Sequence, residues 1–207
     1  EIWRELRSNI IHTRPLEWIS TVTQVASVWY ARKNNVLVYP TGIIGVLIAA
    51  YLYFFDSTPP LYADGALNIY YFAMSVYGWY NWLKKTDDPE QHLPITRTSG
   101  AEWLIITIFT LIATALLTLL LTRFTDTNVP RWDSFVTALS LAATWMVAVK
   151  KLENWLVWIF TDLLYIALYY YKNLYLLAAL FAIYVVIAIQ GYFYWRKLYL
   201  AATHPHQ

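Results

Sequence analysis

One acidic residue interrupts the apolar segment 154–171, and its neighbours could do chemistry with it. At about 100° per residue, Asp162 shares a helix face about 80° wide with two indoles and two phenols, those of Trp155, Trp158, Tyr165 and Tyr169. A helix that crosses a bilayer from Lys151 would place Asp162 about 16 Å along its axis, near the midplane. A carboxylate at that depth costs about 2.5–3.5 kcal/mol and normally faces a cavity or a partner. Aromatic faces around a carboxylate suit a flat organic cation.

Other polar and aromatic side chains within apolar segments are further candidates for a substrate site. Segment 62–83 carries Asn68, Tyr71, Ser75, Gly78 and Trp82 on one face at helical spacing. Such groups also bond their own backbone or a neighbouring helix, and a neighbouring Tyr or Asn could hold the buried acid. We predict a substrate-binding site made of Asp162, Trp158, Trp155, Asn68, Tyr71, Tyr165, Tyr39, Gln24 and Gln190. Trp82 and Trp195 precede basic residues, so we expect them to be interfacial anchors.

The composition excludes several classes of protein. Of 207 residues, 59% are hydrophobic and only 14% are charged, which is too apolar for an ordinary soluble domain and indicates a protein of the lipid bilayer. The net charge of +2 implies no nucleic-acid partner. Cysteine is absent, and all four histidines lie in the tails or in a loop, so we expect no metal site inside the protein. No enzyme or phosphate-binding motif occurs, so we expect neither an enzyme nor a cofactor.

The elements that must position these residues are seven apolar segments of roughly membrane-spanning length. They cover residues 16–31, 36–55, 62–83, 103–122, 132–150, 154–171 and 174–195. The chain 1–207 is therefore predicted to be a single all-α transmembrane domain. The polar stretch 84–102 is expected to be a loop, and residues 1–14 a short interfacial helix. Pro40 and Gly42 are expected to kink or hinge the second segment.

Lysine and arginine in the connections predict the orientation. The larger share lies on one side of the membrane, at Arg32, Lys33, Lys84, Lys85, Arg97, Lys150, Lys151, Arg196 and Lys197. The other side carries Arg123, Arg131, Lys172 and the three arginines of the N-terminal tail. The expected topology has the N-terminus outside and the C-terminus in the cytoplasm.

The two ends of the chain resemble each other. Shifting 61–84 by 113 residues onto 174–197 matches Tyr71 with Tyr184, Gly78 with Gly191 and Trp82 with Trp195, among others. We predict a first repeat at 16–83, a linking helix at 103–122 and a second repeat at 132–195, parallel as in SWEET-type carriers. With a shift of 119 residues, the stretch 39–42 falls on 158–161, so Ile43 stands where the second repeat has Asp162.

Two motifs carry a family resemblance: YGWYNW at 77–82 and ENWLVW at 153–158. With the three-one-three layout, they resemble the Pnu family of bacterial vitamin transporters over nearly the whole chain. The resemblance implies a seven-helix, SWEET-like fold in the bacterial inner membrane, commonly a homotrimer. It also implies facilitated diffusion of a water-soluble vitamin, which a cytoplasmic kinase then traps by phosphorylation.

The resemblance leaves the substrate open. Asp162 and Asn68 stand where the nicotinamide riboside branch usually has Asn and Gln, and the stretches YPTG and WIFTD look more like the thiamine branch. We therefore expect a facilitative carrier for a cationic vitamin, first thiamine and alternatively nicotinamide riboside, since both carry a permanent ring cation. A membrane scaffold or receptor subunit is the alternative of another class, and the short connecting loops argue against it.

Overall fold

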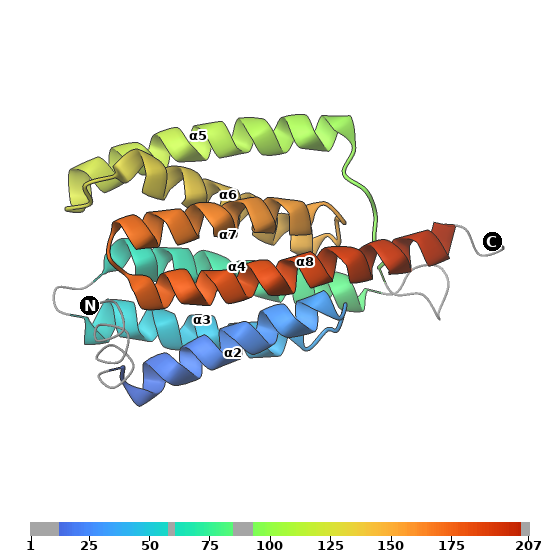
Figure 1. Ribbon diagram of the computed structural model, residues 1–207, viewed down its shortest axis with the longest axis horizontal. Coiled ribbons are helices and arrows are strands. Elements are labelled where there is room, and N and C mark those ends of the chain that lie inside the picture. The colour runs from blue at the N-terminus through green and yellow to red at the C-terminus, as the bar shows by residue number, and fades with distance from the viewer. Residues whose placement is uncertain (1–12, 58–60, 85–92, 204–207) are drawn as a thin grey trace.

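Seven α-helices account for most of the residues that the computed structural model describes, which are 13–57, 61–84 and 93–203 (Figure 1). The helices are α2 (Pro15–Arg32), α3 (Val38–Tyr51), α4 (Tyr62–Leu83), α5 (Gly100–Phe124), α6 (Pro130–Ala148), α7 (Asn154–Tyr171) and α8 (Tyr175–Thr203). All seven predicted segments are confirmed as helices, and α8 extends beyond its predicted end at 195. The interfacial helix expected at 1–14 falls almost wholly outside the described residues.

Six of the helices form a closed ring. Neighbours around the ring pack in the order α2, α3, α4, α6, α7, α8 and back to α2, while α5 packs mainly on α6. Figure 1 accordingly shows α5 along the outer edge of the bundle, beside α6. The helix α5, which connects the segments 16–83 and 132–195, therefore lies outside the ring, and the other six helices surround the interior.

The outer surface is apolar, as a bilayer requires. Leu104, Leu111 and Leu119 of α5 are each more than 60% exposed, and Phe55 is 78% exposed. Within the described residues, three helical stretches meet length and hydropathy criteria for a membrane span by themselves: Val38–Asp56, Gly100–Phe124 and Tyr175–Thr203. The chain thus presents hydrocarbon side chains outward over a bundle of helices, the form in which a segment satisfies its own backbone bonds in lipid.

Local signals in the sequence start and stop these helices. Pro15 and Pro130 occupy the first turns of α2 and α6, where a missing N–H breaks no helix bond. The helices α2, α6 and α7 each end in a turn with one residue in the left-handed region, at Asn34 (φ 50°), Lys150 (φ 53°) and Asn173 (φ 60°). In each turn the following N–H bonds back to a carbonyl of the last helical turn, which closes the helix within a few residues.

Two expectations drawn from the sequence have different outcomes. Pro40 lies in the first turn of α3, where proline removes no helix hydrogen bond, and the expected kink or hinge at Pro40 and Gly42 stays a prediction. Trp82 and Trp195 are not interfacial anchors, since only 3% and 0% of their surfaces are exposed. Their indole N–H groups instead donate to backbone carbonyls inside the bundle.

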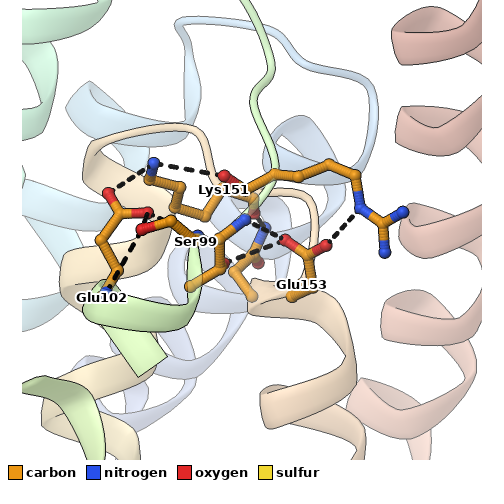
Figure 2. Close-up of polar contacts among 7 residues, drawn as sticks. Ser99, Glu102, Lys151 and Glu153 are labelled. Carbon is orange, nitrogen blue, oxygen red and sulfur yellow. Dashed lines mark hydrogen bonds and ion pairs between the residues drawn. The ribbon is translucent and has the colours of Figure 1, made fainter. Parts of the chain in front are cut away.

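The connection before α5 is pinned to the turn between α6 and α7. The Thr96 N–H donates to the Lys150 carbonyl (3.0 Å), and the Leu152 N–H donates to the Thr96 carbonyl (2.8 Å). Glu153 accepts from Arg97 Nε (2.9 Å) and from the Thr98 N–H (2.8 Å), as Figure 2 shows. The stretch expected to be a loop is therefore held, in its described part, by both backbone and charge-assisted bonds.

The same figure shows how α5 begins. Ser99 caps the helix by accepting from the Glu102 N–H, and the Glu102 carboxylate accepts from the Ser99 N–H at 2.8 Å (Figure 2). Lys151 Nζ lies 2.6 Å from the other Glu102 oxygen. The reciprocal capping box thus starts α5, and the Lys151–Glu102 ion pair ties this start to the turn after α6.

Two glycines let aromatic rings pack directly on helix backbone. A Cβ atom on Gly78 of α4 would lie 2.5 Å from the Tyr39 ring, and one on Gly191 of α8 would lie 2.8 Å from the Trp155 ring. Both separations are far below van der Waals contact, so any larger residue would push the ring away. Gly100, by contrast, has no heavy atom within 4 Å of such a Cβ.

Gly191→Ala is expected to lower stability by about 1–3 kcal/mol, the usual cost of overpacking a tight contact. The matched change Gly100→Ala should leave stability unchanged or slightly raised, because alanine favours helix and meets open space there. Melting temperatures of the purified variants measure both effects. Equal melting temperatures for the two variants would contradict the packing described at Trp155.

Glu153→Gln is expected to lower the melting temperature near neutral pH and to flatten its acid dependence. Burial favours the neutral acid, but hydrogen bonds from Arg97 and Thr98 outweigh it, so the pKa of Glu153 lies below its ordinary value of 4.5. A lowered pKa contributes stability above about pH 4.5 that is lost as the pH falls through the folded-state pKa. Melting temperatures between about pH 7 and about pH 3 measure the difference, and parallel curves for both proteins would contradict the role of this charge.

Candidate functional site

A cavity of about 280 Å³ lies inside the six-helix ring. Each of the six ring helices contributes to its wall, and α5 contributes nothing. Seven of the nine predicted site residues line it: Gln24, Tyr39, Tyr71, Trp155, Trp158, Asp162 and Tyr165. The structure therefore gathers side chains from α2, α3, α4 and α7 around one cavity, as a site for a small molecule requires.

Asp162 is the only acidic residue in the cavity wall, among the described residues. It lies in the middle of α7 with 3% of its surface exposed. Within the described residues, no hydrogen bond or ion pair reaches its carboxylate, and no lysine or arginine lines the cavity. Thr161 beside it bonds the Val157 carbonyl of its own helix (2.7 Å). A buried carboxylate without a protein partner is ready to receive a cation from outside the chain.

Aromatic rings form the wall near Asp162. Tyr165 stacks on Tyr169 with the ring centroids 5.5 Å apart and an angle of 11° between the planes. Phe181 of α8 lies against the Tyr165 ring at a centroid distance of 4.5 Å. The Ser140 and Tyr165 hydroxyl oxygens lie 3.2 Å apart, which joins α6 to α7. Rings held in this way provide a preorganised apolar surface beside the carboxylate.

At the other end of the cavity, two buried polar atoms lack a partner. The Tyr39 hydroxyl and the Trp155 indole nitrogen make no hydrogen bond within the described part of the chain, although both residues are at least 96% buried. Unpaired buried donors usually have a ligand, a water molecule or a strained contact as their explanation. Both residues line the cavity, so a ligand or a water molecule in the cavity would explain why these two polar atoms have no protein partner.

Two predicted site residues do not line this cavity. Asn68 donates to the Asp64 carbonyl one turn earlier on α4 (2.9 Å), a bond within its own helix. Gln190 is exposed on α8, and its side-chain carbonyl accepts a hydrogen bond from Arg32. Gln24 does line the cavity, and its amide donates to the Ser20 hydroxyl (3.0 Å).

The sequence reasoning missed several residues of the wall. Phe181 and Tyr184 of α8 and Met74 of α4 line the cavity but were not candidates. The signal for Tyr184 was present, because the repeat matched it with Tyr71, which was a candidate. Phe181 and Met74 carried no signal, since apolar residues on an apolar helix look alike whichever way they face.

The arrangement can hold a flat cation, and it offers no apparatus for catalysis. Among the described residues, no group of three or more His, Cys, Asp or Glu side chains could hold a metal ion. The cavity wall contains one carboxylate and several hydroxyls, with no histidine or lysine beside a hydroxyl to activate it. Indole and phenol faces next to a carboxylate are instead a recognition surface.

Comparisons with known proteins agree with this geometry. A sequence model of the nicotinamide mononucleotide transporter family matches residues 14–197. The chain is 25% identical over 207 residues to the nicotinamide riboside transporter PnuC of Escherichia coli (strain K12), a match that covers 87% of this chain and 85% of that protein. It is 24% identical to the transporter of the same name from Neisseria mucosa, with 89% and 74% covered.

The fold has a solved counterpart. A crystal structure of the vitamin B3 transporter PnuC superposes with a TM-score of 0.69 at 22% sequence identity, covering 96% of this chain and 88% of that chain. The resemblance to the Pnu family is thereby confirmed, and with it the expectation of a transporter in place of an enzyme. The chain belongs to the nicotinamide mononucleotide transporter family and is a multi-pass membrane transporter of the PnuC type.

Proposed function

We propose that this chain carries nicotinamide riboside across the membrane by facilitated diffusion. The observation that carries the proposal is the carboxylate of Asp162, which has no hydrogen-bond or ion-pair partner among the described residues, in the wall of an aromatic cavity. The relatives described above are named for nicotinamide riboside, so they favour this substrate over thiamine, which the YPTG and WIFTD stretches had led us to expect first.

The pyridinium ring of nicotinamide riboside fits the chemistry of this wall. Its permanent positive charge would be attracted by the Asp162 carboxylate, and its flat face by the Trp158 ring one helical turn away. The indole nitrogen of Trp155 and the hydroxyl of Tyr39 are available as donors for the polar atoms of the ribose or amide. These four residues are the proposed centre of the binding site.

The charge of the cavity favours the riboside over its phosphorylated form. A phosphate group carries about −1.5 to −2 charges near neutral pH and is normally bound by arginine, lysine or a cluster of backbone N–H groups. No lysine or arginine is among the cavity-lining residues, and the one charged side chain there is an acid. A mononucleotide would therefore bring like charges together in a low-dielectric space.

Several further features are proposed from the family and the sequence. Transport of the substrate would not be coupled to transport of an ion, because Asp162 is the one acid at the cavity among the described residues. The carrier would act in the bacterial inner membrane as a homotrimer, with the N-terminus outside and the C-terminus in the cytoplasm. A cytoplasmic kinase would trap the vitamin by phosphorylation as its metabolic partner.

Purified protein in liposomes is expected to take up labelled nicotinamide riboside until the internal and external concentrations are equal. An ionophore that collapses the proton gradient should change neither the rate nor the plateau, because no ion is coupled. With labelled thiamine and labelled nicotinamide mononucleotide, tested in parallel, vesicles that contain the protein should retain no more label than vesicles without it. Uptake of thiamine alone would reject the proposed substrate in favour of its alternative. Accumulation above the external concentration would reject facilitated diffusion.

Asp162→Asn is expected to weaken binding of nicotinamide riboside by about 10- to 150-fold, because the amide keeps the volume but removes the charge that faces the ring cation. Asp64→Asn is the matched control, since Asp64 is an acid in the first turn of α4 that does not line the cavity. Tryptophan quenching gives the dissociation constant, and melting temperatures on the same preparations report folding. Unaltered affinity in well-folded Asp162→Asn protein would remove Asp162 from the site.

A further inference from the structure

Two buried tryptophans form hydrogen bonds between the segment 16–83 and the segment 132–195. Trp82 near the end of α4 donates its indole N–H to the Val147 carbonyl near the end of α6 (3.1 Å). Trp195 of α8 donates in the same way to the Ala31 carbonyl near the end of α2 (2.9 Å). Each bond therefore crosses between the segment 16–83 and the segment 132–195, and the two bonds run in opposite directions.

The two acceptor carbonyls occupy corresponding positions in similar turns. The Ala31 carbonyl also accepts from the Asn34 N–H (2.9 Å), and the Val147 carbonyl from the Lys150 N–H (3.0 Å). Asn34 and Lys150 are the residues in the left-handed region that end α2 and α6. Val147 follows Ala31 by 116 residues, and Lys150 follows Asn34 by the same number. Because each carbonyl keeps this turn bond, losing the indole would leave neither acceptor unsatisfied.

Each tryptophan also holds an aromatic residue of the cavity wall. Trp82 meets Tyr39 edge to face, with centroids 5.2 Å apart and an angle of 88° between planes. Trp195 meets Trp155 in the same manner at 5.5 Å and 86°. Tyr39 and Trp155 are again 116 residues apart, and the Trp82 and Trp195 rings lie 5.9 Å from each other. Four rings thus form one connected cluster at this end of the cavity.

The far side of the cluster is covered as well. Lys150 Nζ lies 4.3 Å from the centre of the Trp82 ring, and Lys150 itself is 3% exposed. Leu93 and Ile95 of the loop before α5 pack against the hydrophobic cluster that contains these rings. Moving outward from the cavity, the order is the Tyr39 and Trp155 rings, then the Trp82 and Trp195 rings, then Lys150 and the loop.

We propose that Trp82 and Trp195 are paired positioning residues of a gate that closes the Lys150 end of the cavity. The inference rests on the proposed transport function, since a binding protein without translocation needs no gate. Substrate can leave past Tyr39 and Trp155 only if these rings separate, and the two crossing N–H bonds hold them together. Asn81 Nδ2 also donates to the Ala148 carbonyl (2.9 Å), and Arg32 donates to Gln190, so the two segments keep further bonds at this end. Breaking both indole bonds therefore loosens the segment 16–83 from the segment 132–195 without freeing it, and the matched geometry lets both halves move alike.

The test uses a cysteine reporter, because the natural chain contains no cysteine. Ser27→Cys places one thiol on the cavity wall, and a membrane-impermeant thiol reagent is applied to one face of oriented vesicles at a time. Trp82→Phe and Trp195→Phe keep a ring but remove the N–H donor. Each is expected to raise the labelling rate from the Lys150 face by about 2- to 10-fold, the range that follows from losing one hydrogen bond.

Controls separate a gate from general loosening. Trp18→Phe, at a half-exposed position outside the cavity wall, should not change labelling from either face. Labelling from the opposite face should stay level or fall in the gate variants, because opening one end favours closure of the other. Lys150→Gln removes the cation over Trp82 but leaves both indoles, and should act in the same direction by a smaller factor. It keeps the test available if a tryptophan variant does not fold.

The outcomes distinguish this inference from the function it rests on. Unchanged labelling from the Lys150 face in every folded variant overturns the gate, and so does an equal increase from both faces. Either result leaves nicotinamide riboside uptake by the unmodified protein untouched. Conversely, a gate response in a protein that fails to take up nicotinamide riboside would overturn the proposed substrate and keep the gate.

Discussion

A carboxylate inside an apolar bundle, with no partner in the described part of the chain, is the constraint on which the other features depend. Asp162 lies in the middle of α7, and lipid contact there would cost several kcal/mol. A closed ring of six helices keeps hydrocarbon away from it, while the outward faces remain apolar. The ring also encloses the cavity, so the same arrangement that shields the acid from lipid presents it to a molecule within.

Close contact between rings and backbone makes the ring of helices dense at one end. The Tyr39 ring packs on Gly78 and the Trp155 ring packs on Gly191, which only residues without a side chain permit. Trp82 and Trp195 then fill the space beyond these rings and bond carbonyls of opposite halves. The interior thus combines a cavity, whose wall includes Asp162, with dense packing near Lys150.

The helices could be predicted from the sequence because their signals are local. A run of about 20 apolar residues is long enough to span a bilayer, and prolines, a capping serine and left-handed asparagines mark where such runs begin and end. Most of the candidate site was also predictable, because a single acid at helical spacing from tryptophans and tyrosines points to one face of α7. Family membership followed from short motifs within the same segments.

The sequence by itself determined the seven helices, the face that carries Asp162 and the family. Only the tertiary structure decided which faces meet. It directs Asn68 to its own backbone, Gln190 to Arg32 at the surface, and Trp82 and Trp195 into the interior. Helical periodicity specifies which side chains share a face, but the neighbouring helix that covers this face depends on packing across the whole bundle.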